Sequence, residues 1–285
     1  MQASSWFRKG MESQQQQLVT VKWIRNNKEL RNRATQRPGI AAIVGVGPKL
    51  GRSIARKFAH HGYTVAILAR DLGTVAEEIA REEKAQVFAI RIDCSDSKSV
   101  RDAFEGVHSL GFVEVLVYNA NYQPLPPNPT PTPFQHIHLD TFQKSVAVSA
   151  VGAFHCAQQV LTGMVERGKG TILFTGCSAS LNAIPGYSHL CCGKFAMRAL
   201  AQCLAREFQP QGVHIAHVII DGVVAPPSYC RRKSGSVGDE SVSSGEGEGT
   251  MDPDAVAQTY WHLHIQDRTA WTQEMDLRSN TATFF

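Results

Sequence analysis

From residue 40 onward, short apolar runs alternate along the chain with stretches of helical periodicity. The apolar runs are rich in Val, Ile or Phe, as expected for strands buried on both faces of a parallel sheet. The predicted strands are residues 40–44, 64–69, 86–92, 113–118, 171–174, 214–220 and 271–277. The predicted helices are residues 50–61, 139–167 and 187–208, with a further helix start at Asp252-Pro253. This alternation predicts a single α/β domain, a doubly wound parallel sheet of the Rossmann type, over residues 39–285.

Two segments interrupt the pattern, and each follows a predicted strand, where ligands bind in open α/β sheets. Residues 122–134 contain six prolines, and residues 231–250 consist largely of Gly, Ser and Glu. The first segment predicts a stiff extended loop and the second a mobile one. Together with the strand end at Cys177, we expect the loop and residues 223–251 to border a substrate pocket.

A glycine-rich turn joins the first predicted strand to the first helix, with the sequence Val-Gly-Val-Gly-Pro-Lys-Leu-Gly-Arg over residues 44–52. Glycines allow a tight turn and a close approach to a pyrophosphate, which then accepts hydrogen bonds from the free N–H groups of the helix. The alternative is a structural tight turn without a ligand. The turn predicts coenzyme contacts from Gly45, Gly47, Lys49, Leu50 and Gly51.

The end of the second predicted strand indicates which nicotinamide coenzyme is preferred. A carboxylate there would hold the ribose hydroxyls of NAD, but the sequence reads Ala69-Arg70. A small residue followed by a cation suits a 2′-phosphate, and Lys49 is a second cation for it. NADP(H) is therefore favoured, while the adjoining Asp71 keeps NAD(H) open as the alternative.

Composition and charge limit the class of protein. The 285 residues are 43% hydrophobic with 29 basic and 25 acidic side chains, and the seven cysteines form no C-x-x-C pair. We therefore expect an intracellular protein with reduced thiols, no membrane span and no nucleic-acid partner. Residues 1–38 carry eight Lys or Arg and only two Glu. They are either a disordered extension, which leaves the protein cytoplasmic, or an organelle-targeting peptide.

These motifs resemble the short-chain dehydrogenase/reductase family over about residues 40–277. The turn is similar to the family's T-G-x-x-x-G-x-G, with Gly45 and Gly51 matching and Lys49 replacing the middle glycine. Asp93 matches the acid that contacts adenine in the family, and Asn119-Ala120 resembles the start of its N-A-G motif. The resemblance implies a nicotinamide coenzyme and a homodimer or homotetramer formed through helices 139–167 and 186–208.

The resemblance also shows departures at the catalytic positions. In the family a Tyr donates the proton, and a Lys four residues later lowers the Tyr pKa and holds the nicotinamide ribose. Here Lys194 is present, but Leu190 stands at the Tyr position. Cys177, followed by Ser178, stands where the family has its substrate-orienting Ser, and Ser149 where it has the Asn that anchors a relay water.

Tyr187 is a substitute candidate for the proton donor. Its seven-residue spacing to Lys194 resembles that of the enoyl-thioester reductases within the family, and two helical turns, about 10.5 Å, keep both side chains on one face. The alternative is an aromatic residue that only lines the pocket. Cys177 is a further candidate, with the alternative of a small core residue.

Three functional hypotheses follow. The first is an NADP(H)-dependent oxidoreductase for a small hydrophobic carbonyl, alcohol or enoyl substrate, suited to the apolar Leu181, Ile184 and Leu190, with Tyr187, Ser178 or a bound water giving the proton. The second is an NADPH-binding pseudoenzyme that acts as sensor or scaffold. The third, an interaction protein without coenzyme, would leave the glycine turn without a use.

The pairs His136/His138 and His262/His264 lack further ligands, so no metal is expected, and Cys191-Cys192 is interpreted as packing.

Overall fold

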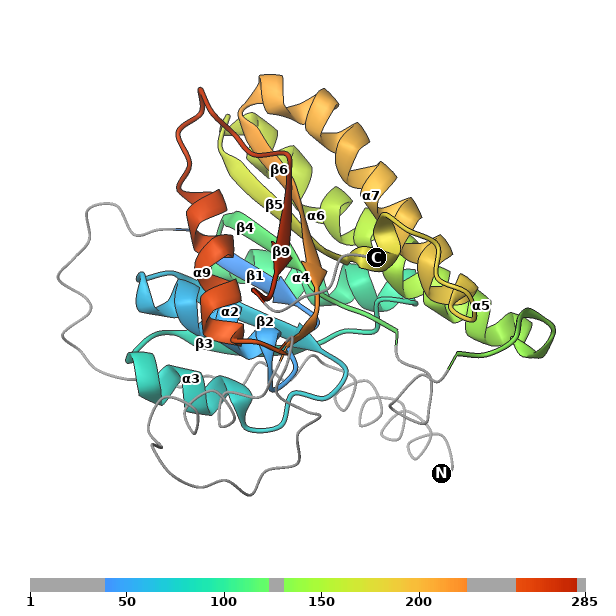
Figure 1. Cartoon of the computed structure of the whole chain (residues 1–285). Helices are drawn as coiled ribbons and strands as arrows, with labels where there is room; N and C mark the ends of the chain where they lie inside the picture. Colours follow the sequence, from blue (N-terminus) through green and yellow to red (C-terminus); the bar gives the residue numbers. More distant parts are fainter. Residues whose placement is uncertain (1–38, 123–130, 225–249, 281–285) are drawn as a thin grey trace, which may run out of the picture.

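The computed structural model describes residues 39–122, 131–224 and 250–280, and shows a parallel sheet with helices on both faces (Figure 1). The predicted extension 1–38, most of the Pro-rich segment and nearly all of the Gly/Ser-rich segment lie outside these residues. The strands are β1 (Ile40–Val44), β2 (Thr64–Ala69), β3 (Val87–Arg91), β4 (Val113–Tyr118), β5 (Gly170–Cys177), β6 (Val213–Asp221), β7 (Val223–Val224), β8 (Thr250–Met251) and β9 (Glu274–Arg278). The main sheet has the order β3-β2-β1-β4-β5-β6-β9, and β7 pairs with β8.

The helices include two, α3 and α4, that the sequence analysis did not single out. In chain order they are α2 (Leu50–His60), α3 (Val75–Glu83), α4 (Ser97–Leu110), η2 (Phe134–His136), α5 (Leu139–Val146), η3 (Ala147–Val151), α6 (Gly152–Glu166), η4 (Ser178–Ser180), α7 (Ser188–Phe208), η5 (Gln209–Gln211) and α9 (Pro253–His264). The predicted cap is confirmed, because the Asp252 side chain accepts the backbone N–H of Asp254. None of these helices is long and apolar enough to span a membrane.

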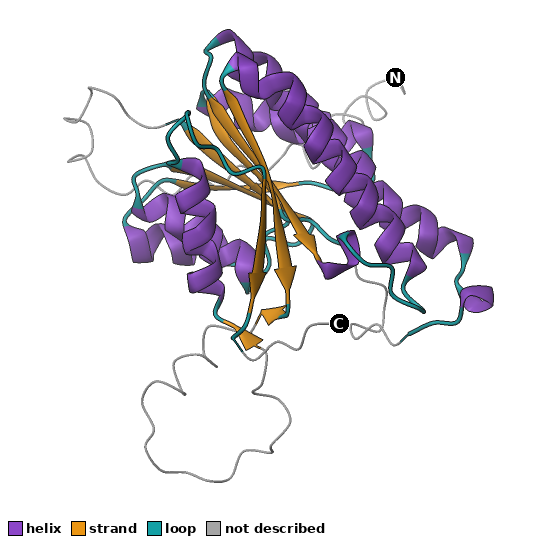
Figure 2. Cartoon of the chain, turned by 45° about the horizontal axis from the view of Figure 1, so that its top comes forward, coloured by secondary structure: helices purple, strands orange, loops and turns teal. Residues whose placement is uncertain are grey.

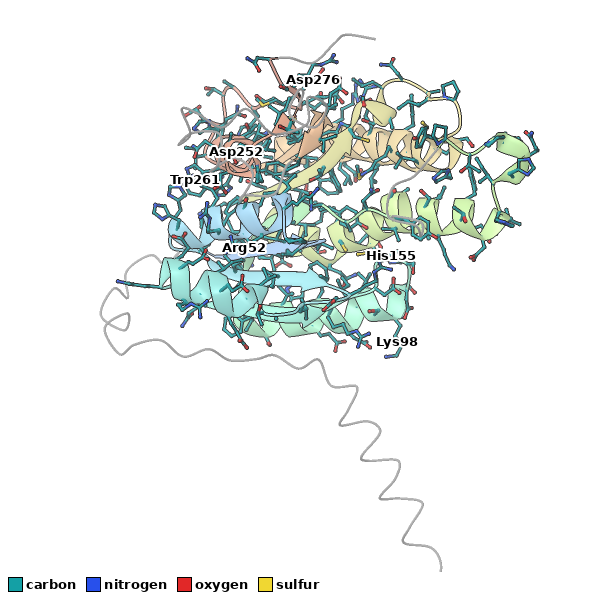
Figure 3. The ribbon with its side chains drawn as sticks, turned by 60° about the horizontal axis from the view of Figure 1, so that its bottom comes forward. Arg52, Lys98, His155, Asp252, Trp261 and Asp276 are labelled. Carbon is teal, nitrogen blue, oxygen red and sulfur yellow. The ribbon has the colours of Figure 1, made fainter. Side chains whose placement is uncertain are left out.

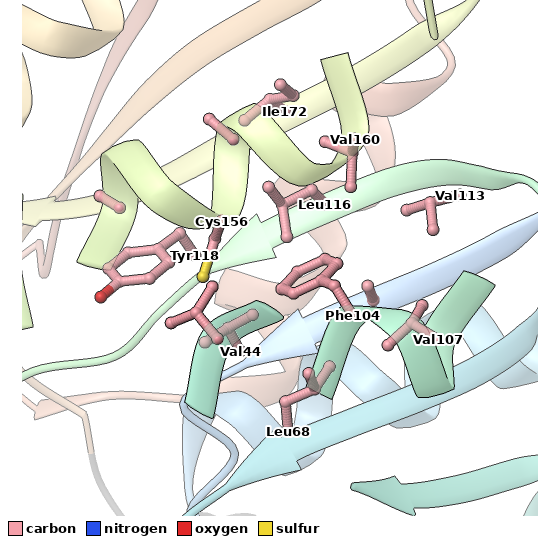
Figure 4. Close-up of a cluster of buried hydrophobic side chains, with 14 of the residues drawn as sticks. Val44, Leu68, Phe104, Val107, Val113, Leu116, Tyr118, Cys156, Val160 and Ile172 are labelled. Carbon is pink, nitrogen blue, oxygen red and sulfur yellow. The ribbon is translucent and has the colours of Figure 1, made fainter. Parts of the chain in front are cut away.

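Two apolar cores lie on opposite faces of the sheet. One joins the sheet to α4, α6 and α7, and Figure 4 shows Phe104 of α4 and Val160 of α6 packed around Leu116 of β4. The other joins the sheet to α2, α3 and α9 through residues such as Phe58 and Tyr260. Because both faces are covered, the central strands are mostly apolar, which explains why the apolar runs located them. The predicted doubly wound fold is confirmed.

The predicted helix over residues 139–167 is confirmed in extent, but its pitch changes in the middle. The structure has α5 and α6 separated by the π-helical segment η3. The π turn holds one additional residue, and it lies against α7, where a Cβ on Gly193 would be 2.9 Å from Cβ of Ser149. The change of pitch lies where the two helices pack together, and the apolar pattern of the segment carries no sign of it.

All strand pairs in the main sheet are parallel, so the carboxyl ends of the strands meet at one edge (Figure 2). Gly45, Arg70, Asn119 and Cys177 follow or end β1, β2, β4 and β5 at this edge. Asp93 lies two residues beyond β3. The topology therefore brings the coenzyme and catalytic candidates to one side of the molecule.

Candidate active site

The turn after β1 passes unusually close to the end of β4. Gly45 has a φ of +85°, and a Cβ on it would overlap the backbone of Ala120. Only glycine fits this position without strain. The Asn119 side chain donates from Nδ2 to the Gly45 carbonyl oxygen at 2.8 Å, which fixes the turn against β4.

The same turn leaves space and hydrogen-bond donors for a ligand. A Cβ on Gly51 would lie 2.8 Å from Cα of Val46, whereas one on Gly47 would meet nothing within 4 Å. Helix α2 then begins at the buried Leu50, with Lys49 exposed at the N-cap, no side-chain cap and no acidic residue in the first turn. An uncapped helix start with no nearby carboxylate in its first turn suits an anion. These residues fit a coenzyme pyrophosphate.

Arg52, the cation that ends the motif, points away from this turn. Its guanidinium donates to Glu82 at 2.5 Å and lies 3.7 Å from Glu78, both on α3 (Figure 3). Arg52 therefore joins α2 to α3.

Arg70 and Asp93 lie close enough at neighbouring strand ends to interact electrostatically. Arg70 is exposed directly after β2, and Asp93 accepts hydrogen bonds from Oγ and the backbone nitrogen of Ser95 at 2.7 and 2.9 Å. Burial alone would raise the pKa of the Asp93 carboxyl, but the Ser95 hydrogen bonds and the Arg70 charge bring this pKa below its ordinary value. Asp93 is thus an ionised acceptor beside an exposed cation.

Lys194 is buried, with 4% of its surface exposed, and its Nζ donates to the Thr175 carbonyl oxygen of β5 at 3.1 Å. Burial lowers the pKa of Lys194, and the neighbouring Cys177 thiol acts in the opposite direction. The arrangement brings together Lys194 and Cys177. The partner Thr175 was missed in the sequence because a backbone carbonyl has no sequence motif.

The remaining catalytic candidates lie at the start of α7, directly after β5 and in η3. Tyr187 is half-buried at the N-cap of α7, and Leu190 follows it in the first turn. Ser178 is half-buried at the start of η4, directly after β5. Ser149 is fully buried in η3, where its Oγ faces Gly193 and makes no hydrogen bond within the described chain. The catalytic roles of Tyr187, Ser178 and Ser149 stay predictions.

The histidine and cysteine pairs occupy different surroundings. Cys191 is buried and Cys192 exposed, so the packing interpretation is wrong for Cys192. His262 is exposed, and its Nε2 meets Gln258 at 2.8 Å, whereas His264 belongs to a partly buried network. Over residues 39–122, 131–224 and 250–280 no three His, Cys, Asp or Glu residues are grouped as metal ligands.

A separate hollow of about 400 Å³ lies at the other edge of the sheet. Its lining residues are Gly168, Gln209, Pro210, Gln211, Gly212, Arg268 and Trp271. These residues precede β5, β6 and β9, where the strands begin, so the hollow is remote from the glycine turn.

Comparison with known proteins agrees with this geometry. The family profile for short chain dehydrogenases matches residues 39–229. This chain belongs to the short-chain dehydrogenase family. A curated family member, the inactive 2-(S)-hydroxypropyl-CoM dehydrogenase 2 of Xanthobacter autotrophicus, is 29% identical over 195 residues, which are 67% of this chain and 80% of that protein.

Solved structures of the family have the same fold. A short-chain dehydrogenase from Rhodopseudomonas palustris superposes with a TM-score of 0.69 at 27% identity, covering 85% of this chain and 98% of that one. The alcohol dehydrogenase of Thermococcus sibiricus, solved with 5-hydroxy-NADP, gives 0.72 at 24% identity, covering 87% and 99%. The second likeness shows the fold alone.

Proposed function

We propose that this short-chain dehydrogenase binds NADP(H) and catalyses hydride transfer between it and a small hydrophobic carbonyl, alcohol or enoyl compound. The observation that carries the proposal is a buried lysine, Lys194, at the same sheet edge as an open phosphate-binding turn. A lysine ammonium removed from water is costly unless a ligand or a protein group uses it. Lys194 has a carbonyl oxygen on one side and would hold the nicotinamide ribose on the other.

The proposed coenzyme contacts combine the family resemblance with the positions of these residues at the strand ends. The turn residues Gly45, Gly47, Lys49, Leu50 and Gly51 would hold the pyrophosphate. Arg70 would pair with the 2′-phosphate, Asp93 would accept from adenine, and Asn119 with Ala120 would line the nicotinamide side. When bound, the coenzyme supplies or accepts the hydride.

A proton must accompany the hydride, and Leu190 has no group that can transfer one. We propose Tyr187 as the donor, since it is half-buried at the start of α7 and its phenol hydroxyl can donate a proton. Ser178, Cys177 or a bound water is the alternative source. The apolar side chains of Leu181, Ile184 and Leu190 favour a hydrophobic substrate.

Turnover tests this proposal. NADPH oxidation should be followed with a panel of hydrophobic aldehydes, ketones and enoyl thioesters. Tyr187→Phe should lower kcat about 100-fold if Tyr187 is the acid, because general acid catalysis contributes roughly 10²–10⁴-fold. Cys192→Ser, a change at an exposed position of α7, is the matched control and should leave kcat unchanged. Unchanged turnover in Tyr187→Phe would exclude Tyr187 as the donor.

A second candidate is a pseudoenzyme that binds NADPH as a sensor or scaffold. Leu190 favours it, and a relative 29% identical over 195 residues is named an inactive dehydrogenase. Tight NADPH binding without oxidation by any member of the panel would favour this candidate over the enzyme.

We further propose a homodimer or homotetramer. Val151 and Phe154 on the η3–α6 segment and Phe195 on α7 are 46%, 44% and 39% exposed. Burying such side chains between copies would stabilise an assembly. Light scattering of the purified protein should report at least twice the chain mass of 31.3 kDa, and a monomer at micromolar concentration would contradict the proposal.

A further inference from the structure

His217 lies in the middle of the mostly apolar strand β6, beneath α7. His217 is 1% exposed, and its Nδ1 meets Glu274 Oε2 of β9 at 3.1 Å. Glu274 in turn accepts two hydrogen bonds from Arg198 of α7, at 2.7 and 2.8 Å. A carboxylate only accepts, so Nδ1 carries the proton and Nε2 bears the lone pair of the neutral ring.

That lone pair is directed at a glycine of the neighbouring strand. Nε2 of His217 makes no hydrogen bond within the described residues. A Cβ on Gly176 would overlap Nε2 and lie 2.6 Å from Cε1. The ring therefore rests on the Cα hydrogens of Gly176, a contact that a lone pair tolerates and an N–H does not.

The peptide unit beneath this ring is the one that binds Lys194. Thr175 precedes Gly176, and its carbonyl oxygen accepts the Lys194 Nζ at 3.1 Å. A chain of contacts thus runs from Arg198 through Glu274 and His217 to the Thr175–Gly176 peptide and Lys194. Each link joins a different element, namely α7, β9, β6 and β5.

The charges around the ring oppose its protonation. Burial lowers the pKa of His217, Glu274 raises it, and the cations Lys194 and Arg198 lower it further. The net direction is downward, so the ring is neutral at physiological pH. The groups around Lys194 are the Thr175 carbonyl and Cys177 on β5, His217 on β6, and the uncharged Ser149 of η3 facing the neighbouring Gly193.

We propose that His217 is a positioning residue for Lys194: its neutral ring, clamped by Glu274 and Arg198, braces Gly176 and so keeps the Thr175 carbonyl under the lysine. Protonation at Nε2 places an N–H against Gly176. It also adds a positive charge near Lys194 and Arg198, which releases the lysine. This inference rests on the proposed coenzyme site, because its consequence is a loss of NADPH affinity on acidification.

The pH dependence of NADPH affinity tests the proposal. We expect the ratio of Kd at pH 5.5 to Kd at pH 8 to be about twofold larger for wild type than for His217→Gln, because the lowered pKa of His217 lets only part of the protein take up the proton at pH 5.5. His214→Gln is the matched control, since His214 lies on the same strand, is 1% exposed and bonds to the Thr272 carbonyl at the far end of β6. It should keep the wild-type ratio. Equal ratios for wild type and His217→Gln would overturn the proposal.

Two double-mutant cycles complete the test. In a Lys194→Gln background, His217→Gln should no longer change the NADPH affinity, because His217 acts through Lys194.

Gly176→Ala should lower the unfolding midpoint of the free protein, and Gly176→Ala/His217→Ala should recover part of it by removing the overlapping ring. If wild type binds no NADPH at pH 8, the proposed function fails, and the unfolding cycle decides separately whether His217 braces Gly176. An absence of recovery overturns the bracing contact.

Discussion

Asn119 joins two strand ends by itself: its Nδ2 donates to the Gly45 carbonyl oxygen and its backbone N–H to the Val44 carbonyl oxygen, each at 2.8 Å. The side-chain bond holds the glycine turn in the conformation in which Gly45 touches Ala120. The shape of the proposed pyrophosphate cradle therefore depends on the residue that follows β4 as well as on the glycines that follow β1.

Replacing Asn119 by Ala should weaken both the fold and the cradle. The loss of one partly buried hydrogen bond predicts a decrease of about 1 kcal/mol in the free energy of unfolding, together with weaker NADPH binding. Denaturant unfolding and coenzyme titration measure the two effects. Asn121→Ala, at an exposed position two residues later, should change neither. A stable Asn119→Ala variant with wild-type affinity would contradict the role of the side chain.

Arg70 should determine the preference for NADPH over NADH. Arg70→Ala is predicted to weaken NADPH binding about tenfold, which corresponds to ~1.4 kcal/mol, and to leave NADH binding unchanged, because only NADPH carries the 2′-phosphate. Arg81→Ala removes an exposed cation of α3 and serves as the control. An equal loss of affinity for both coenzymes in Arg70→Ala would show that Arg70 does not bind the 2′-phosphate.

Position 190 offers a gain-of-function test. Leu190 lies one turn before Lys194 on α7, so a phenol placed there would share a helix face with the lysine. Leu190→Tyr should raise kcat for a carbonyl substrate at least tenfold above Leu190→Phe, which has the same ring without the hydroxyl. Equal rates for the two variants would mean that the missing phenol is not what limits the reaction.

A hydrogen-bonded network at the opposite edge of the sheet predicts a pH dependence of stability. The Tyr63 hydroxyl donates to Glu114 at 3.0 Å and so accepts from Nε2 of His264 at 2.6 Å. This leaves Nδ1 of His264 as the acceptor for the Thr171 hydroxyl at 2.9 Å. The network needs a neutral imidazole, and burial lowers the pKa of His264 to about 4.

The sign of the effect follows from the two states of His264. The unfolded chain binds a proton near pH 6.5, and the folded protein binds it only near pH 4. Stability should therefore fall as pH drops between these values, by about 3 kcal/mol for this group. Urea unfolding at several pH values should show a shallower slope in His264→Gln. An identical slope would contradict the assignment.

The fold was predictable where burial alone decides the structure. The Val- and Ile-rich runs located β1, β2, β4 and β6 closely, because strands covered on both faces have few polar positions. Gly45 and Gly51 stood out by their spacing, and the structure gives each a steric reason. Helices α3 and α4 have only three and four buried residues among polar and charged ones, so the apolar runs did not indicate them.

Contacts between distant segments were not predictable. Glu274 lies 76 residues from Arg198 and 57 from His217 along the chain, and it meets them because β6 pairs with β9 beneath α7. The histidines within the apolar run of β6 were the available signal. The π turn at Ser149 and the carbonyl partner of Lys194 likewise result from packing and from backbone geometry.

The most direct test of the proposed coenzyme site is titration of the purified protein with NADPH, followed by coenzyme fluorescence, beside the variant Gly47→Val. Because a Cβ at Gly47 would meet no protein atom within 4 Å, the variant should unfold at the wild-type midpoint while its side chain occupies the space of the pyrophosphate. We predict saturable binding by wild type and a loss of at least about tenfold in Gly47→Val. No binding by wild type, or equal affinity in the variant, would contradict the assignment of the glycine turn.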